Sequence, residues 1–507
     1  MNLAILAERH VERYGERVSL IFEGTRLTNV WQLQRSRHFA TALAEIGVVP
    51  GDRVGVMLPN SPDVLTSYGA ITRVGAVIMP MVFLLAVPEV QHILHDSGAK
   101  VVITSPEFAP KIAESIAGMP SPPIVIVTGA GPFSDGTLSF ESLLAGATTG
   151  HPIVDRDSDD LAVVSYTSGT TGRPKGVMLT HGNQLFNAET SSRAVPIHDG
   201  DVTVMCLPLA HLFGISVMLT GQMVDATGVM LPWFTAEGFF AAVNDYGVTS
   251  SAMVPTMLTY MLQHPDFEKV NWSTFRWVVM GAAPLPLELT EEFEKRTGAR
   301  VLEGYGLTET SPTATVMRIE ERRQGSCGRP VPGVGIRILD DDDKEVPVNT
   351  PGEVCIQGPN VMKGYYNMPE ETATALRGGW FHSGDIGHVD EDGYLYITDR
   401  KKDMIIRGGF NIYPRDVEEV LYGHPAVGEV GVVGIPDARL GEEVRAYVVL
   451  KPGAEATEEE LLGYCRSILA KYKTPKSVVF TDALPKNPIG KILKKDLREI
   501  ARQEMGL

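Results

Sequence analysis

The sequence predicts an α/β protein with mostly parallel sheets in a large N-terminal part and a smaller α+β domain at the C-terminal end. Short apolar runs alternate with amphipathic segments up to about residue 310, which is the pattern of βαβ units. A chain of 507 residues is too long for a single hydrophobic core. After Gly393 the pattern changes, over a final stretch of the size of one small domain.

The composition is that of an ordinary globular protein, with 44% hydrophobic and 21% charged residues. The net charge of −17 argues against nucleic acid, and against an anionic membrane surface, as the main partner. The four cysteines form no CxxC pair, so neither a disulfide framework nor a zinc site is expected. We find no secretory signal and no apolar run of about 18 residues, and therefore expect no membrane-spanning segment and a cytoplasmic location.

The first elements follow from alternation and capping signals. Residues 17–28 alternate like a hairpin, and the segment 28–46 is an amphipathic helix with Thr28 as its N-cap and Gly47 after its end. Residues 115–158 are rich in Gly, Pro, Ser and Asp and are interpreted as connecting loops. Three buried strands, each next to a helical segment, are predicted at 53–58, 76–80 and 100–104.

The C-terminal part is predicted to begin near a polar cluster at 399–403. A helix opens at Thr457, because Glu460 three residues later completes a capping box. The acidic run 340–344 is interpreted as an exposed turn rather than a calcium loop, which needs spaced ligands and a closing Glu. The other C-terminal elements are strands at 394–398, 431–435 and 444–450 and a helix near 415–422.

One stretch, 166–176, has the chemistry of a phosphate cradle. Its eleven positions hold three glycines, four hydroxyl residues and two cations, and it follows a predicted strand at 161–164. Glycines permit a backbone whose N–H groups form an anion-binding concavity, to which Lys175 adds a point charge. A triphosphate suits this chemistry. The stretch is not the common P-loop, because Gly176 follows Lys175 where Ser or Thr is required.

Two further stretches suit a nucleotide base and a metal ion. After a predicted strand at 277–280, the small residues Gly281-Ala282-Ala283 let a flat ligand approach the backbone, although a plain turn would look the same. Tyr305 lies between two glycines, where its ring face can stack on a base. Glu309 offers the hard oxygen that a phosphate-bound magnesium ion requires.

Two other stretches suit the ribose and the reacting phosphate. Asp385 follows a glycine and can accept protons from ribose hydroxyls, or make an Asx-turn instead. Lys491 stands on a loop flanked by prolines, from which its ammonium can be delivered to a developing phosphate charge. An isolated lysine near a helix start would otherwise be a solvated cation.

Taken together, five motifs resemble in order and spacing the core motifs of the adenylate-forming enzymes, the superfamily of acyl-CoA synthetases, peptide-synthetase adenylation domains and beetle luciferases. The resemblance runs from the first hairpin to the end of the chain. Residues 408–414 and 472–476 look most like bacterial fatty or aromatic acyl-CoA ligases. The five motifs are 166–176, Gly304-Tyr305-Gly306-Leu307-Thr308-Glu309, Ser383-Gly384-Asp385, Asp399-Arg400-Lys401-Lys402-Asp403 and Pro488-Ile489-Gly490-Lys491.

This resemblance implies a large domain over residues 1–399 with a β-barrel-like part, a hinge at 400–403 and a small mobile domain over 404–507 that carries the catalytic lysine. It implies an acid–thiol ligase that uses ATP, Mg²⁺ and coenzyme A with a small-molecule carboxylic acid. The expected assembly is a monomer or a homodimer.

In the implied first step, a carboxylate attacks the α-phosphate of ATP, so that pyrophosphate leaves and an acyl-adenylate remains. Thr308 would contact the α-phosphate, Glu309 would bind Mg²⁺, and Lys491 would stabilise the charge shared by carboxylate and α-phosphate. The resemblance assigns Asp385 and Arg400 to the ribose. It assigns to the phosphates Thr167, Ser168, Gly169, Thr170, Thr171, Gly172 and Lys175. It assigns to adenine Gly281, Ala282, Ala283 and Tyr305, with Glu303, Gly304 and Gly306 beside them.

In the implied second step, the small domain rotates about Lys402, and the thiol of coenzyme A attacks the adenylate through a tunnel beside Gly408 and Gly409. Lys491 must leave before the thiol arrives, so that domain motion lets one cleft perform both steps. Positioning and electrostatics carry the catalysis, and no side-chain nucleophile is required.

The acyl pocket is predicted around His211, which by the resemblance would border the acyl carboxylate, although a packed core histidine is the alternative. No cation falls within 281–287 to hold a second carboxylate, so an apolar fatty or aromatic acid is favoured. Its apolar neighbours are expected to be Met218, Trp233, Phe234, Met253, Val254 and Met257.

Two alternative functions stay open. An acyl-AMP ligase that loads a carrier protein commonly has an insertion before the small domain, and the segment 330–352 is short here, which favours coenzyme A. A catalytically inactive binding protein on the same fold is disfavoured because every charged motif residue is intact. Nothing in the sequence supports a light-emitting reaction.

Overall fold

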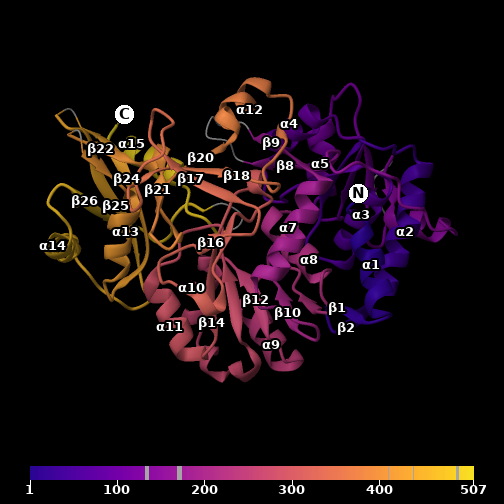
Figure 1. The fold of residues 1–507 in the computed structure, drawn as a ribbon, viewed down its shortest axis with the longest axis horizontal. Coiled ribbons are helices and arrows are strands. Elements are labelled where there is room, and N and C mark those ends of the chain that lie inside the picture. The colour runs from indigo at the N-terminus through magenta and orange to yellow at the C-terminus, as the bar shows by residue number, and fades with distance from the viewer. Residues whose placement is uncertain (132–135, 168–173, 409, 438, 487–489, 507) are drawn as a thin grey trace.

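The computed structural model describes residues 1–131, 136–167, 174–408, 410–437, 439–486 and 490–506. Figure 1 shows a large part that contains the N-terminus and a smaller part, orange to yellow, that contains the C-terminus. Among the described residues, three sheets belong to the large part and one to the small part. No helix in these ranges combines the length and apolar character needed to cross a membrane.

An eight-stranded sheet occupies the N-terminal side, with the order β19-β9-β8-β4-β3-β5-β6-β7. Its inner strands pair in parallel, as the βαβ alternation predicts, whereas β8 and β9 pair antiparallel. Thr167 lies opposite Lys175 in that pair, which brings the two ends of the glycine-rich stretch together. The strands are β3 (Arg53–Met57), β4 (Val77–Pro80), β5 (Val101–Thr104), β6 (Ile124–Val127), β7 (Leu138–Ser139), β8 (Leu161–Thr167), β9 (Lys175–Thr180) and β19 (Gly364–Tyr365).

A nine-stranded sheet follows, with the order β16-β15-β14-β13-β12-β10-β11-β1-β2. Its central strands run parallel, and Met280 of β13 pairs with Glu303 of β14. The segments that leave these two strands therefore start side by side at one edge. The strands are β1 (Val18–Phe22), β2 (Thr25–Thr28), β10 (Val202–Met205), β11 (Thr227–Met230), β12 (Ser250–Met253), β13 (Trp277–Met280), β14 (Arg300–Tyr305), β15 (Thr315–Val316) and β16 (Arg329–Pro330).

Helices cover both large sheets. Thr28 caps α2 as predicted, since its side chain accepts a hydrogen bond from the backbone N–H of Trp31. The largest core contains fully buried residues such as Phe39, Leu43 and Ile71. The helices of the large part are α1 (Ile5–Tyr14), α2 (Asn29–Glu45), α3 (Pro62–Arg73), α4 (Val87–Ser97), α5 (Ala109–Ile116), α6 (Phe140–Gly146), α7 (His181–Ala194), α8 (Leu212–Gly221), α9 (Ala236–Tyr246), α10 (Pro255–Gln263), α11 (Leu287–Thr297) and α12 (Pro369–Ala375).

The part expected to resemble a barrel is built on a four-stranded antiparallel sheet of β17 (Gly335–Leu339), β18 (Gly352–Gln357), β20 (Phe381–Val389) and β21 (Leu395–Arg400). The acidic run 340–344 forms an exposed turn between β17 and β18, as predicted. Asp385 lies opposite Arg400 across β20 and β21.

The small part has its own core, since its buried residues such as Ile405, Val432 and Leu461 contact one another. Thr457 and Glu460 form the predicted capping box. A single 3-10 turn at Lys401–Asp403 connects the small part to β21. Its elements are β22 (Ile405–Arg407), β23 (Phe410–Ile412), β24 (Val427–Asp437), β25 (Gly441–Leu450), β26 (Ser477–Phe480), α13 (Pro414–Tyr422), α14 (Glu458–Ile468) and α15 (Lys494–Glu504).

The prediction for residues 115–158 was partly wrong, because β6, β7 and α6 lie within them. The strand β6 is four residues long and its flanks are rich in Pro, Gly and Ser, so the composition of the flanks outweighed its apolar run. Ser139 caps α6 by accepting the backbone N–H of Ser142.

Candidate active site

A cavity of about 860 Å³ collects residues from the large sheets, the four-stranded sheet and the small part. Gly408 does not line it. The predicted residues Ser168, Gly169, Thr170, Thr171, Gly172 and Gly409 lie outside the described residues. The cavity is lined by the predicted residues Thr167, Lys175, His211, Gly281, Ala282, Ala283, Glu303, Gly304, Tyr305, Gly306, Thr308, Glu309, Asp385, Arg400, Lys402 and Lys491.

One corner of the cavity combines a phenol, a carboxylate and a guanidinium. The hydroxyl of Tyr305 donates to Oδ2 of Asp385 at 2.7 Å, and Nε of Arg400 lies 3.1 Å from Oδ1 of the same carboxylate. Asp385 raises the pKa of Arg400, and burial together with Asp385 raises the pKa of Tyr305. Both oxygens of the Asp385 carboxylate are thus held by neighbouring side chains at the edge of the cavity.

Glu309 provides a second carboxylate, in the short turn Thr308–Thr310 that follows β14. Its Oε1 accepts a hydrogen bond of 3.0 Å from the hydroxyl of Tyr365, and burial raises the pKa of Glu309. The ammonium of Lys175 lies 5.1 Å from the centre of the Tyr365 ring. A hard oxygen in surroundings that disfavour its charge is a suitable ligand for a divalent cation such as Mg²⁺.

Lys491 reaches the cavity from the loop before α15. Burial and, to a smaller extent, the nearby Arg400 together lower the pKa of Lys491 to about 8, so the ammonium is mostly charged at neutral pH. The loop contacts the large part, because the hydroxyl of Thr256 in α10 donates to the carbonyl of Gly490 at 2.7 Å. This contact fixes the backbone immediately before the lysine.

His211 is the N-cap of α8. Its Nδ1 accepts the backbone N–H of Phe213 at 3.3 Å. Burial lowers the pKa of His211 to about 4, with a further contribution from Lys491. The imidazole is therefore neutral at pH 7, and its place among cavity residues favours the predicted acyl border over a packed core histidine.

The edge of β13 and β14 offers an approach to a flat ligand. A Cβ on Gly281 would lie 3.4 Å from the Phe213 ring, and a Cβ on Gly306 would lie 1.7 Å from the carbonyl oxygen of Pro312, so only glycine fits at 306. Ala282 has a φ of 69°, a rare conformation that turns the chain sharply after β13. Burial raises the pKa of the neighbouring Glu303 to about 7.

The predicted hinge lies at the edge of the same cavity. Burial lowers the pKa of Lys402, and Arg400 lowers it further. The next residue, Asp403, forms an ion pair of 2.9 Å with Arg498 of α15.

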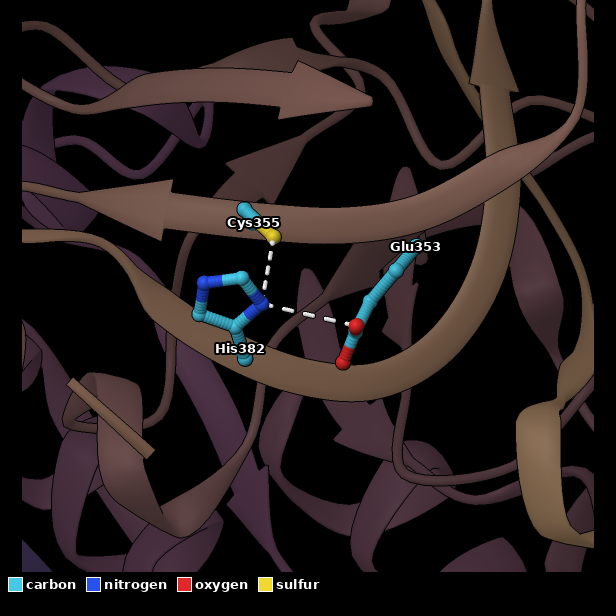
Figure 2. Close-up of side chains that lie close together, drawn as sticks. All are labelled: Glu353, Cys355 and His382. Carbon is cyan, nitrogen blue, oxygen red and sulfur yellow. Dashed lines mark hydrogen bonds and ion pairs between the residues drawn. The ribbon is translucent and has the colours of Figure 1, made fainter. Parts of the chain in front are cut away.

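Glu353, Cys355 and His382 form a cluster of side chains near the turn that precedes Asp385, and Figure 2 shows the three side chains pointing toward one another. Nδ1 of His382 lies 3.3 Å from the Cys355 sulfur and 3.4 Å from Oε2 of Glu353. Glu353 also accepts the backbone N–H of Gly384 at 3.0 Å. The three side chains are close enough to share a small cation.

Two cationic side chains already lie near the Glu353 carboxylate, however. Arg377 and Lys401 lie 3.5 Å and 3.7 Å from Oε2 of Glu353. Burial raises the pKa of the Cys355 thiol to about 12, so it stays protonated. We therefore interpret the cluster as a hydrogen-bonded support for the turn that precedes Asp385.

The structure corrects the prediction of the acyl pocket. None of the six apolar neighbours, Met218, Trp233, Phe234, Met253, Val254 and Met257, is among the cavity-lining residues. Met253 and Met257 are buried in the core below the nine-stranded sheet, and Trp233 is 43% exposed. Val217, one position before Met218 on α8, lines the cavity instead, because successive helical residues point about 100° apart.

Sequence reasoning missed Tyr365 and Thr256. Each acts through a partner more than fifty residues away, Glu309 for Tyr365 and Gly490 for Thr256. No local pattern marks either residue, since both contacts arise from tertiary packing.

The chain is similar to known proteins over nearly its whole length. A family model described as AMP-binding enzyme matches residues 7–366, and one described as AMP-binding enzyme C-terminal domain matches residues 416–491. The chain is 40% identical to a feruloyl-CoA synthase of Amycolatopsis, over 94% of each chain. It is 37% identical to a long-chain-fatty-acid–CoA ligase of Mycobacterium tuberculosis, over 91% of this chain and 90% of that relative.

A solved structure is also similar to this chain over its whole length. The anthranilate CoA ligase AuaEII in complex with anthranoyl-AMP superposes with a TM-score of 0.95 at 28% identity, over 100% of this chain and 98% of that one. Agreement of this quality over the whole chain requires the small C-terminal part to be oriented as in that acyl-adenylate complex.

Proposed function

From the premise that this chain belongs to the family of AMP-binding enzymes, we propose that it binds ATP, a carboxylic acid and coenzyme A at the cavity between its two parts. The chain is an AMP-forming acyl-CoA synthetase, which converts an acid to its acyl-adenylate with release of pyrophosphate and then to the coenzyme A thioester. ATP and coenzyme A are its cosubstrates, and Mg²⁺ is its metal cofactor.

One observation carries the assignment of the site: Lys491, from the small part, lies in the same cavity as Asp385, Arg400 and His211 from the large part. An ammonium at this place can stabilise the negative charge that develops between an attacking carboxylate and the α-phosphate. The described orientation of the two parts is therefore the one that we assign to adenylate formation.

The other roles follow the chemistry of each group. Asp385, held by Tyr305 and Arg400, would accept the hydroxyls of the ribose. The backbone at Gly281–Ala283 would lie against the adenine, and Lys175 beside the outgoing pyrophosphate. Glu309 would hold Mg²⁺, which when bound neutralises phosphate charge; the raised pKa of Glu309 indicates a carboxylate whose charge the protein alone stabilises poorly.

We propose the division of the chain into residues 1–399, a hinge at 400–403 and a small domain over 404–507. Gly408 lies away from the cavity in this orientation, and its neighbour Gly409 is outside the described residues. A rotation about Lys402 would withdraw Lys491 and bring this segment to the adenylate for attack by the thiol. We also propose a cytoplasmic enzyme that acts as a monomer or homodimer.

An apolar acid is the proposed substrate. The part of the cavity next to His211 is walled by Phe213, Val217 and Val279, and no cationic residue lies on α8 or β13 to bind a second carboxylate. Both a fatty and an aromatic acid satisfy these conditions, in line with the two relatives described above.

A panel of carboxylic acids tests the activity. With ATP and Mg²⁺, we expect pyrophosphate release with an apolar monocarboxylate, and consumption of coenzyme A with formation of the thioester. An adenylate that accumulates in the presence of coenzyme A would favour the ligase that loads a carrier protein, and no pyrophosphate from any acid would favour the inactive binding protein.

Lys491→Ala tests the division of roles. The variant should lower adenylate formation about 100-fold or more, since it removes the charge that the first step requires. It should form thioester from supplied acyl-adenylate at nearly the wild-type rate. Equal loss of both half-reactions would contradict the assignment of Lys491 to the first step alone.

A further inference from the structure

The inner end of the acyl part of the cavity carries hydroxyl groups along one face of α8. Phe213, Ser216, Val217 and Thr220 all line the cavity, at the spacing i, i+3, i+4 and i+7 of a single helix face. Phe213 and Val217 make the apolar side of this face. Ser216 and Thr220, one turn apart, add two hydroxyls to a wall that a simple alkyl chain would contact.

Thr220 differs in its hydrogen bonding from other buried helical threonines of this protein. Buried threonines on helices of this protein, such as Thr72 and Thr259, donate to the carbonyl four residues earlier, at 2.9 Å and 3.2 Å. Thr220 is 7% exposed, yet its hydroxyl makes no hydrogen bond within the described residues. Its donor and acceptor capacity therefore faces the cavity.

Ser216 also keeps bonding capacity for the cavity. Its oxygen accepts a hydrogen bond of 2.7 Å from Nδ2 of Asn187, which is fully buried on α7. In either orientation of the Asn187 amide, this contact uses only one side of the hydroxyl, and a proton or a lone pair stays available. The amide also fixes the position of the serine oxygen.

The rise per residue of α8 and of β13 gives the depth of these hydroxyls. Along α8, Ser216 lies about 7 Å and Thr220 about 13 Å beyond His211, at 1.5 Å per residue. Along β13, Trp277 lies about 13 Å from Gly281, at about 3.3 Å per residue. Trp277 also lines the cavity, is 4% exposed, and its indole N–H already donates to the carbonyl of Pro196 at 3.1 Å, so its ring offers an apolar wall at this depth.

We infer, on the basis of the proposed function, that Ser216 and Thr220 select a monocarboxylic acid that carries a hydroxyl or ether oxygen about 7–13 Å from its carboxylate. A chain that advances about 1.2 Å per bond reaches this range in six to eleven bonds. Two skeletons have that length: an arylpropenoic acid with an oxygen on the far side of the ring, and an alkanoic acid of eight to ten carbons with a terminal hydroxyl.

The preference for an oxygenated acid follows from the free-energy cost of a buried hydroxyl that has lost its hydrogen-bond partner. In the free enzyme, water can bond to Ser216 and Thr220. An acid without an oxygen at this depth displaces that water, which leaves the Thr220 hydroxyl unpaired and Ser216 with its bond to Asn187 alone, whereas an oxygenated acid replaces the water. Sites that bond a substrate hydroxyl reject analogues that lack it far more strongly than apolar pockets distinguish methylene groups.

Matched pairs of acids test the inference by kcat/KM for pyrophosphate release. The first pair is 3-phenylpropenoic acid and its 4-hydroxy derivative, and the second is octanoic acid and 8-hydroxyoctanoic acid. We expect the oxygenated member of one pair to be preferred by about tenfold or more. The pair that shows the preference identifies the skeleton as aromatic or aliphatic.

Three variants locate the effect. Ser216→Ala and Thr220→Val remove a hydroxyl at nearly constant volume, and at least one should reduce the preference about tenfold, with the plain acid reacting faster because the cost of an unpaired hydroxyl is gone. Thr72→Val, which removes a buried helical hydroxyl far from the cavity, should keep the full preference, and thermal unfolding confirms that all variants are folded.

Equal rates for both members of both pairs would overturn the inference. So would variants at 216 and 220 that slow plain and oxygenated acids alike. Absence of pyrophosphate release with every acid is a different result, which would contradict the proposed function itself.

Discussion

Lys491 is the residue whose proposed role depends most directly on its charge state. Burial lowers the pKa of Lys491 to about 8, while burial lowers the pKa of His211 to about 4. The ammonium is therefore present below pH 8 and is lost as the pH rises through this value. The imidazole stays neutral throughout, so it contributes no charge to the change.

We predict that kcat/KM for ATP in pyrophosphate release falls above about pH 8, approaching tenfold per pH unit, because this parameter reports the free enzyme. Thioester formation from supplied adenylate should lack this decline. Lys491→Arg is the matched control, since a guanidinium keeps its proton over the whole range. Its residual activity should be constant from about pH 7 to about pH 9.5. A wild-type profile that is constant over the same range would contradict the role of the ammonium.

At the scale of elements, Glu353 connects three parts of the site. It stands on β18, accepts the N–H of Gly384 on β20, and approaches Arg377 and Lys401. Gly384 directly precedes Asp385, whose carboxylate contacts Tyr305 and Arg400. Glu353 is thus a positioning residue for Asp385, to which we assign the ribose, and it does not line the cavity itself.

We predict that Glu353→Gln raises KM for ATP about threefold to tenfold and leaves kcat nearly unchanged, because one charge-assisted hydrogen bond to the turn is weakened. Steady-state kinetics with varied ATP measures both parameters. The control is Glu345→Gln in the same sheet region, an exposed carboxylate 3.6 Å from Arg337, which should change neither. A drop in kcat with unchanged KM would instead place Glu353 in the chemical step.

Elements with strong local signals could be predicted from the sequence. The alternation of apolar runs and helices located β3, β4, β5 and β13, since buried parallel strands have few polar residues. Capping residues such as Thr28 and Thr457 fixed the starts of their helices. The short strand β6 was missed, because four apolar residues between Pro-rich and Gly-rich flanks give too weak a pattern.

The site could be predicted only in part, for a similar reason. Motif residues such as Asp385 and Glu309 could be predicted, because their sequence context reveals their chemistry, and both line the cavity. The acyl pocket could not be located from composition, because Val217 and Met218 are equally apolar and only the rotation of α8 decides which of them meets the cavity. Contacts such as Tyr365 with Glu309 depend on packing between distant elements.

At the scale of the whole molecule, the contact from Thr256 in α10 to the Gly490 carbonyl holds the loop of Lys491 against the large part. Thr256→Val keeps the shape of the side chain and removes the donor. We predict that adenylate formation slows about fivefold, the effect of one hydrogen bond, while thioester formation from supplied adenylate is unchanged.

Separate assays of the two half-reactions measure this effect. Thr297→Val is the control, because its hydroxyl donates within α11 and it does not line the cavity. Slower thioester formation in the Thr256 variant would mean that the contact also matters after the domain has moved.

The strand whose Arg400 contacts Asp385 runs directly into the proposed hinge, since Arg400 ends β21 and the turn Lys401–Asp403 follows it. If the small domain rotates as we propose, nucleotide occupancy and domain orientation are coupled, and such coupling is reciprocal. If bound ATP favours the orientation with Lys491 in the cavity by some factor, that orientation must raise the affinity for ATP by the same factor. Under this proposal, the departure of pyrophosphate and its charge would weaken the preference for this orientation by the same reciprocity, so the first reaction itself would release the domain for the second.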